Sequence, residues 1–568
     1  TFTVRGNVGT DSRWNAGVSG AYSRQGLTVS GDAGYRRDRG EGTFEQLRER
    51  RDPITGQFLE SRNIADTENV PESRNVRGAV EWDYNRTDRL SAEIRHRAFE
   101  VNFESLGRFE AENALGVVDR AYVRDGEGGF GRSNTGLTTG WRRKWADGHE
   151  LVADLSLERT EGDRHQRFST DNTLPSATPD SYEDIRTDLT SDQLRSKIDY
   201  QRPLGDEQKL RLGYEVTVDQ NEYDNFGARG PTLATLAVDP ALTNEFLYDQ
   251  TVHAVYGTYE RPFGENFVAQ FGVRVEQALI DIDQVTSNIQ ASNDYLRAYP
   301  TLNVAWTLGE GQRLSAGYSR RIQRPRPEDL NPYVVYVDPQ NLRSGNPDLD
   351  PQETDSFELG YQYRQGATFY LATLFYRESR KGVTDVVQDL GNGIFLTTRE
   401  NLGKGRAAGL ELNANGRITR TLTYGAGVNV FWNEIEARNL GFAQTRDGWS
   451  LGGRFNLNWQ PTEKDFFQVN GFMQGERLQA QGYAEPSGML NLGYRRKLND
   501  RLSLTFTAQN VLDSMKQETV IDTPDLRDRF VQRFMKPAAF IGFTYTIGDG
   551  NARRRPEPAF DFDPGVGG

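Results

Sequence analysis

The sequence contains no cysteine, which excludes disulfide bridges and thiolate-metal sites. It has only four histidines, and none is spaced as a metal-binding pair: His96, His149, His165 and His253. Nucleophile elbows, phosphate-binding loops and dinucleotide-binding fingerprints are also missing. We therefore expect no catalytic residue, no bound metal and no cofactor, and we do not expect an enzyme.

Long apolar runs are absent too. No stretch approaches the roughly 18 apolar residues of a membrane-spanning helix. The formal net charge of −13 argues against a nucleic-acid partner, because phosphate binding requires clustered Lys and Arg. The mean hydropathy is low, at −0.72. A low average still permits a membrane β-barrel, in which only every second residue of a strand faces lipid.

The clearest pattern in the chain is a hairpin between Tyr295 and Ile322. Residues alternate there between an apolar face (Leu296, Ala298, Leu302, Val304, Trp306, Leu308) and a polar face (Arg297, Tyr299, Thr301, Asn303, Thr307). Successive side chains of a strand point to opposite faces, so this pattern predicts strands with one apolar and one polar face. Each strand has about ten residues or more, which suits a tilted crossing of the hydrocarbon layer.

The same alternation recurs along the chain and predicts about 22 strands. Their ranges are 2–9, 14–22, 27–37, 74–84, 89–100, 132–145, 149–159, 186–200, 208–218, 248–260, 267–279, 294–307, 312–322, 353–364, 367–376, 406–418, 421–432, 448–459, 466–476, 484–496, 501–511 and 537–547. In lipid every backbone polar group must be paired, so a membrane sheet has to close on itself. We therefore predict an all-β fold: one transmembrane, antiparallel, up-and-down β-barrel over residues 1–547. The alternative is a soluble propeller, whose strands are shorter and come in fours about every 40–45 residues.

The connections between the predicted strands alternate between tight turns and long loops. The long ones cover 38–73, 101–131, 160–185, 219–247, 323–352, 377–405 and 512–536. Short turns at one rim and long loops at the other are typical of an outer-membrane barrel, with the turns in the periplasm and the loops outside. We therefore expect a protein of the Gram-negative outer membrane, in contact with its lipid.

The alternation also assigns side chains to the two faces of the wall. Aromatic residues near strand ends are predicted to lie at the lipid headgroups: Trp14, Tyr84, Trp145, Tyr200, Tyr248, Trp306, Trp432, Trp459 and Tyr545. Charged residues in the other phase are predicted to face the lumen: Glu93, Arg95, Asp154, Glu158, Arg274, Glu276, Arg321 and Arg454. Such a polar wall suits either water or a docked plug domain.

Three segments carry motifs of one family. Residues 320–361 contain a strand end followed by RP (324–325), LNPY (330–333), DP (338–339), GNPDLDP (345–351) and ELGY (358–361). Residues 400–418 contain an N-x-G-x₅-G-x-E strand, and residues 508–514 an N-hydrophobic-x-D element. Together these resemble the TonB-dependent outer-membrane receptor/transporter family, and the resemblance covers essentially residues 1–547.

The resemblance implies energised uptake of a scarce solute, either a small molecule or a peptide, driven by a TonB-type coupling protein. It implies capture by the long loops, of which 38–73, 323–352 and 512–536 are the candidates. The individual ligand-binding candidates are Arg324, Asn331, Tyr333, Tyr336 and Asn346. The last strand carries Gly542, Tyr545 and Ile547 in the spacing of a signal read by the barrel-assembly machinery.

The sequence departs from the family in two places. The family has a plug domain and a TonB-contacting box before the barrel, whereas this sequence opens directly in a strand, so a plug would be upstream, separate or absent. Residues 548–568 are rich in proline, glycine and charge, which predicts a disordered periplasmic tail that a protein partner could bind. These departures support an alternative function: a non-transporting barrel that acts as a surface anchor or assembly platform and holds other proteins through its lumen, loops or tail.

Overall fold

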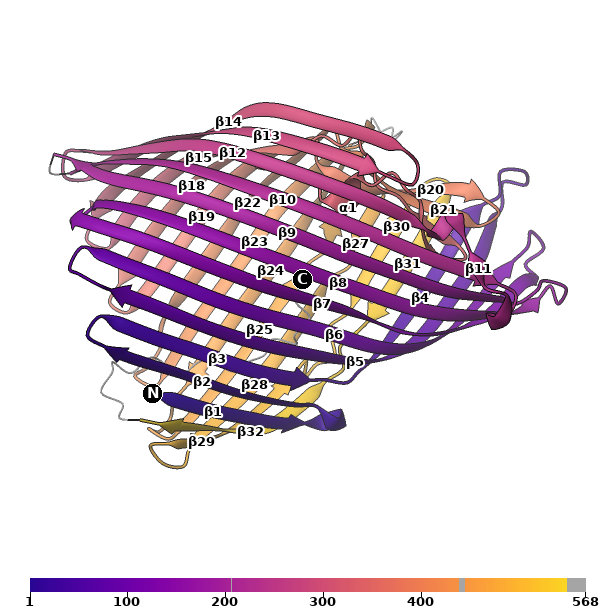
Figure 1. The fold of residues 1–568 in the computed structure, drawn as a ribbon, viewed down its shortest axis with the longest axis horizontal. Coiled ribbons are helices and arrows are strands. Elements are labelled where there is room, and N and C mark those ends of the chain that lie inside the picture. The colour runs from indigo at the N-terminus through magenta and orange to yellow at the C-terminus, as the bar shows by residue number, and fades with distance from the viewer. Residues whose placement is uncertain (206, 439–444, 549–568) are drawn as a thin grey trace.

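The first and last strands of the chain pair with each other and close the wall into a cylinder (Figure 1). The computed structural model describes residues 1–205, 207–438 and 445–548; the tail predicted at 548–568 lies outside this part except for Gly548. The main sheet has 28 strands. The closed ring uses 22 of them, each antiparallel to both neighbours. The predicted barrel is thereby confirmed.

The wall strands follow one another around the cylinder in chain order. They are β1 (Phe2–Gly9), β2 (Trp14–Arg24), β3 (Leu27–Arg37), β5 (Phe58–Asp83), β6 (Asp88–Glu112), β7 (Val118–Ala146), β8 (His149–Leu174), β9 (Ser181–Leu204), β10 (Gln208–Gly230), β12 (Asn244–Phe263), β13 (Phe267–Gln284), β14 (Ile289–Gly309), β15 (Gln312–Gln323), β18 (Gln352–Gln365), β19 (Thr368–Arg380), β22 (Lys404–Arg417), β23 (Leu422–Glu436), β24 (Arg446–Trp459), β25 (Asp465–Gln474), β28 (Ser487–Lys497), β29 (Leu502–Gln509) and β32 (Ala538–Ile547). Each contains or overlaps one predicted strand.

Shorter strands extend the wall at the end opposite the tight turns. They are β4 (Gly40–Arg51), β11 (Ala237–Val238), β26 (Arg477–Leu478), β27 (Gly482–Ala484), β30 (Gln517–Asp522) and β31 (Leu526–Arg533). The helices are single turns: η1 (Thr10–Ser12), η2 (Leu233–Thr235), η3 (Pro240–Leu242) and α1 (Pro327–Leu330). None of the helices within 1–205, 207–438 and 445–548 is long and apolar enough to cross a bilayer.

The two faces of the wall follow the predicted alternation. In β14, Leu302 and Trp306 lie on the outer face, 36% and 52% exposed, while Tyr299 points inward and is 6% exposed. Inward charges pair across strands, as Arg95 and Glu158 do at 2.7 Å. The assignment of Tyr248 to the headgroup region was wrong: its side chain points inward and is 3% exposed.

Five of the predicted long loops were also wrong, because most of their residues lie in strands that continue or extend the wall: 38–73, 101–131, 160–185, 219–247 and 512–536. Strands β5 to β10 have 23 to 29 residues. At about 3.3 Å per residue they reach about 75–95 Å, far more than a hydrocarbon layer about 30 Å thick requires. Neighbouring strands extend together, so backbone pairing continues outside the lipid. At this long-hairpin end (right in Figure 1) the wall therefore projects well beyond the membrane.

Candidate functional site

Two connections at the long-hairpin end fold together into a second sheet. The segment between β15 and β18 supplies β16 (Val335–Asp338) and β17 (Asn341–Arg343), and the segment between β19 and β22 supplies β20 (Val383–Gly391) and β21 (Ile394–Asn401). Strand β17 pairs in parallel with β21, which joins the two segments. Figure 1 shows α1, β20 and β21 close together at this end. We call β16, β17, β20, β21 and α1 the lid.

An apolar cluster fastens the first half of the lid to the inside of the wall. Leu330 and Leu349 of the lid segment are 4% and 2% exposed. They pack with Phe246, Tyr248, Ile280 and Ile282, which are inward residues of β12 and β13. Burying a leucine side chain stabilises a structure by about 1.5–3 kcal/mol. The inner wall is thus apolar at this height because a loop packs against it.

Polar contacts join the lid to β7, β9 and β10. Arg124 of β7 donates to Tyr336 at 3.1 Å and to Glu183 at 2.7 Å. Arg229 forms an ion pair with Glu183 at 3.2 Å and lies 4.7 Å from the centre of the Tyr336 ring. Burial raises the pKa of the Tyr336 phenol above its usual value, so this hydroxyl stays protonated at neutral pH. Nearby, the hydroxyl of Tyr122 donates to Gln340 Oε1 at 2.5 Å.

Other contacts join the lid to β4 and β31. Arg48 of β4 donates to Asp528 of β31 at 2.7 Å and to Asn341 of the lid at 3.0 Å. Its guanidinium carbon also lies 4.0 Å from the centre of the Phe395 ring. Arg50 forms a longer ion pair with Asp389 at 3.5 Å. The lid therefore spans the mouth of the barrel from β7 and β10 to β4 and β31.

The β20–β21 half of the lid is held by hydrogen bonds. The side chain of Gln481 accepts from the Val387 nitrogen at 2.7 Å and donates to the Val387 oxygen at 3.1 Å. Arg399 forms ion pairs with Asp329 at 2.9 Å and with Asp385 at 2.7 Å. Of these, only the Asp329 pair reaches the segment anchored by Leu330 and Leu349. Apolar contacts hold this half too, because Val383 of β20 packs against the cluster that contains Leu330 and Leu349, and Phe395 of β21 is 2% exposed.

The five residues predicted to bind ligand all lie in or beside the lid segment, and each has a partner there or on the wall. Arg324 donates to Glu276 at 2.5 Å and to Tyr295 at 2.7 Å. Asn331 accepts from the Tyr333 nitrogen, the Tyr333 hydroxyl donates to the Pro240 oxygen, and Asn346 donates to the Arg399 oxygen. Tyr336 accepts a hydrogen bond from Arg124. None of them lines either of the two hollows between β5 and β8, and their role in ligand binding stays a prediction.

Arg48, Tyr122, Gln340 and Gln481 were not among the predicted site residues. Their partners are remote in sequence: Arg48 and Asn341 are 293 residues apart, and Tyr122 and Gln340 are 218 apart. Arginine and glutamine are common on the wet faces of strands, so residue type carried no signal. Only the folded wall brings these residues together.

The residues predicted as an assembly signal lie in the strand that closes the cylinder. Gly542 pairs with Asn7, and Ile547 pairs with Phe2. A Cβ on Gly542 would lie 1.8 Å from Asn7 Oδ1 and 2.5 Å from the Gly6 oxygen, so only glycine fits. Tyr545 pairs with Val4 on one side and Leu502 on the other. Recognition by the assembly machinery stays a prediction, and glycine at 542 has a structural reason of its own.

The lumen beneath the lid carries a chain of ion pairs across β9 to β15. Arg195 forms an ion pair with Glu215 at 2.8 Å, and Arg274 forms another with Glu215 at 3.2 Å. Arg274 also meets Glu276 at 2.6 Å, which in turn contacts Arg324. These charges neutralise one another along the wall. Within the described residues no group of three or more Cys, His, Asp or Glu could hold a metal ion.

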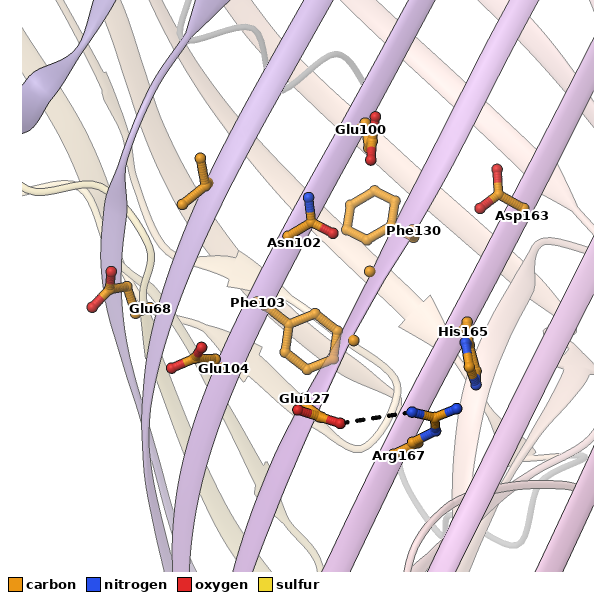
Figure 2. A pocket seen from close by; sticks show the side chains of 13 residues that line it. Glu68, Glu100, Asn102, Phe103, Glu104, Glu127, Phe130, Asp163, His165 and Arg167 are labelled. Atoms are coloured by element: carbon orange, nitrogen blue, oxygen red, sulfur yellow. Dashed lines mark ion pairs between the residues drawn. The ribbon is translucent and has the colours of Figure 1, made fainter.

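A hollow of about 500 Å³ lies on the outer face of β5 to β8, beyond the lipid-facing residues (Figure 2). Most of its lining side chains share the outward phase of Ile94 and Leu137, and they are largely acidic: Glu68, Glu100, Glu104, Glu127 and Asp163, with His165 and Arg167. Outward-facing Gly129 leaves space between them. Glu127 and Arg167 are 3.9 Å apart. This hollow opens away from the lumen.

Comparisons with known proteins agree with this geometry. The model of the outer membrane protein beta-barrel family matches residues 143–545. No curated protein matches the sequence. The fold is similar to the ferric yersiniabactin uptake receptor FyuA from Yersinia pestis: TM-score 0.62, 13% identity, 96% of this chain and 80% of that chain covered. The fold is also similar to the ferric-catecholate import receptor Fiu from K12 E. coli, with a TM-score of 0.63 and 11% identity over 96% of this chain and 81% of that chain.

A third similar structure is the siderophore receptor PiuA from Acinetobacter baumannii, with a TM-score of 0.63 and 11% identity over 96% of this chain and 81% of that chain. At such low identity these structures establish the fold alone, and they confirm the predicted resemblance to TonB-dependent receptors at that level. The family model spans more than half of the sequence. The chain therefore belongs to the outer membrane protein beta-barrel family and is a protein of the bacterial outer membrane.

Proposed function

We propose that this chain forms the barrel of an energised, TonB-linked uptake receptor for a scarce solute. The observation that carries the proposal is the lid, which spans the mouth of a polar lumen at the long-hairpin end. The barrels of similar fold include proteins named as uptake and import receptors and as a copper transporter. The long-hairpin end would face outward and capture the solute.

The way the lid is held favours a moving part. Its β20–β21 half makes polar contacts outside the lid, such as those of Val387 with Gln481 and of Asp389 with Arg50. Water can replace such contacts, so each contributes only about 0.5–1.5 kcal/mol net. The four strands of the lid would swing away together about the segment anchored by Leu330 and Leu349, because β17 pairs with β21. Solute entering past β20 and β21 would then meet the polar wall.

Uptake of a scarce solute also requires partners. A plug domain would close the wide lumen against free diffusion, and a TonB-type protein would supply the energy to move it. The barrel-assembly machinery would insert the chain by recognising β32. We also propose that the tail, residues 548–568, binds a protein partner. The lumen charges that already pair with one another are compatible with a docked plug.

The test is to lock the lid. The chain has no native cysteine, so Tyr122→Cys and Gln340→Cys can be joined by a short bismaleimide without background labelling. Gln481→Cys with Val387→Cys locks the other half. If the lid gates uptake, cross-linked cells lose solute accumulation, and the uncross-linked double variants keep it.

The matched control joins two wall residues that pair away from the lid, Leu410→Cys and Val430→Cys. Uptake that survives both lid cross-links would reject a gate. A barrel that only anchors other proteins would keep its assembly intact in every variant, which separates the alternative function from the proposed one.

A further inference from the structure

Three arginines form a diagonal row on the inner wall between the lid and the lipid-facing zone. They are Arg97 of β6, Arg132 of β7 and Arg164 of β8. Arg132 lies opposite Phe99 and Gly162, and Arg164 lies opposite Phe130. Each arginine is thus the diagonal neighbour of the next, with Cβ atoms about 7–8 Å apart. We call these residues the arginine row.

The inward direction of the row follows from strand alternation. Arg132 shares the phase of Tyr122 and Arg124, which contact the lid, and opposes Leu137 on the outer face. Arg95 of β6 and Glu158 of β8 form an ion pair in the lumen. Arg97 is two residues from Arg95, and Arg164 is six residues from Glu158, so both also point inward. All three guanidinium groups therefore project into the lumen.

None of the three has an anionic partner. Within the described part of the chain, no carboxylate oxygen lies within 4.0 Å of the row, although other inward arginines, such as Arg195 and Arg274, are paired. Glu158 of β8 is already held by Arg95 at 2.7 Å and by Asn134 at 2.6 Å. The row is an uncompensated positive strip in a chain whose net charge is −13.

The acidic residues of these strand segments lie on the opposite face. Glu100, Glu161 and Asp163 point outward and line a hollow of about 330 Å³ that adjoins the one in Figure 2. Strand alternation alone produces this arrangement, since neighbouring residues such as Asp163 and Arg164 point to opposite faces. Arg74 and Arg132 also belong to the lining of this hollow, but no carboxylate of the described residues lies within 4.0 Å of Arg132.

Two aromatic rings lie within the row. Phe99 and Phe130 have ring centres 5.8 Å apart and occupy the inward positions opposite Arg132 and Arg164. Gly162, on the other side of Arg132, has no side chain, and Leu189 of β9 lies 3.5 Å from where its Cβ would be. The guanidinium groups of the row are therefore flanked by apolar side chains rather than by carboxylates.

We propose that the arginine row binds a solute with two or more phosphate or carboxylate groups as it passes through the lumen. Guanidinium groups present paired N–H donors that match both oxyanions in a two-point geometry. An anion bound between them would also reduce the mutual repulsion of three unpaired cations. The inference deepens the proposed function, because it names the class of solute that the barrel takes.

The test measures binding of two probes, tripolyphosphate and citrate, to the whole folded chain in detergent by calorimetry. The row variant carries Arg97→Ser, Arg132→Ser and Arg164→Ser. The matched control carries Arg5→Ser, Arg313→Ser and Arg454→Ser, which removes three inward arginines that also lack ion pairs but stand apart from one another. Gel migration before and after heating checks that each barrel is folded.

We expect saturable binding to the parent chain, at least tenfold weaker binding to the row variant, and a change of less than twofold in the control. Binding of only one probe assigns the site to phosphate or to carboxylate. Equal losses in both variants, or no saturable binding of either probe to the parent, would overturn the inference. If the triple variant does not fold, Arg132→Ser alone is compared with Arg313→Ser.

This measurement needs neither energy coupling nor transport. Binding without uptake in cells would reject the proposed function and leave the anion site in place. If cells that carry the row variant took up solute as well as the parent does, the arginine row would have no role in uptake, and the proposed function would stand without it.

Discussion

Arg48 and Asp528 form an ion pair with Nη2 and Oδ2 2.7 Å apart, and both side chains are more than nine-tenths buried. The two residues are 480 positions apart in the sequence. The pair lies where β4 meets β31, and the same guanidinium donates to Asn341 of the lid. One buried arginine thus joins two hairpins of the wall to the part that spans the mouth.

Removing the carboxylate should release the lid on this side. Asp528→Asn leaves a buried cation without its counter-charge, which costs about 3–5 kcal/mol in such pairs. We expect amide hydrogen exchange in β17 and β21 to accelerate by two or more orders of magnitude, while exchange in wall strands such as β14 is unchanged. The matched control is Asp525→Asn, because Asp525 is 78% exposed and its pair with Arg51 spans 3.7 Å. Exposed pairs contribute about 0–1 kcal/mol, so equal effects of the two variants would contradict a role for burial.

The hairpin β30–β31 should loosen in acid. Burial would raise the pKa of Glu518, but hydrogen bonds from Lys516 and Arg529, both at 2.6 Å, outweigh it and hold the pKa below its usual value. A lowered carboxylate pKa stabilises the fold above the unfolded pKa, near 4.3, and the stabilisation is lost as the pH falls through the folded value. We expect exchange in β30 and β31, corrected for the intrinsic rate, to rise below about pH 4. Glu518→Gln should remove this dependence, and a parent profile that is flat down to pH 3 would count against it.

The membrane wall could be predicted from the sequence because lipid imposes a rule on every strand. Outward residues such as Leu302 and Trp306 must be apolar, and inward ones such as Asn303 need not be, so alternation reveals each crossing. Beyond the lipid both faces are wet and the rule ends. In β6 the alternation continues but is reversed: Val101 and Phe103 are in the inward phase, and polar residues such as Asn102 are in the outward phase. A polar outer face does not indicate a membrane crossing, so this part was predicted as a loop.

The lid could not be predicted for a different reason. Its parallel pairing of β17 with β21 joins residues more than fifty positions apart, such as Asn341 and Phe395, and short segments of this kind carry no periodicity of their own. Tyr248 shows an intermediate case. It is in phase with Ala254 and Tyr256, which point inward, rather than with Val255, which is 61% exposed. The strand alternation indicates that Tyr248 points inward, whereas the preference of tyrosine for membrane interfaces favoured an outward position.

The face assignment of β14 can be tested directly. Val304 lies on the outer face between Leu302 and Trp306, whereas Asn303 points into the lumen. Val304→Lys places a charge in lipid and should cost about 2–4 kcal/mol near the midplane. Asn303→Lys should change the stability by less than about 0.5 kcal/mol, because surface substitutions of this kind are usually neutral. Reversible unfolding in urea from lipid vesicles measures both, and equal losses would refute the assignment.

The pairing of β1 with β32, which closes the cylinder, gives a prediction that depends on a single added atom, a Cβ at position 542. Gly542 of β32 faces Asn7 of β1, and any side chain there would meet both Asn7 Oδ1 and the backbone oxygen of Gly6. The side chain of Asn7 could rotate away, but the backbone oxygen belongs to the ladder that closes the cylinder. Gly542→Ala should therefore destabilise the barrel by about 1–3 kcal/mol, as overpacking does elsewhere. Gly425→Ala in β23 is the control, since a Cβ there meets nothing within 4 Å and the backbone has no left-handed conformation. Unfolding in urea should separate the two variants by at least 1 kcal/mol. If both unfold at the same urea concentration, the seam tolerates a side chain, and the glycine at 542 would then be explained by recognition during assembly instead of by closure of the wall.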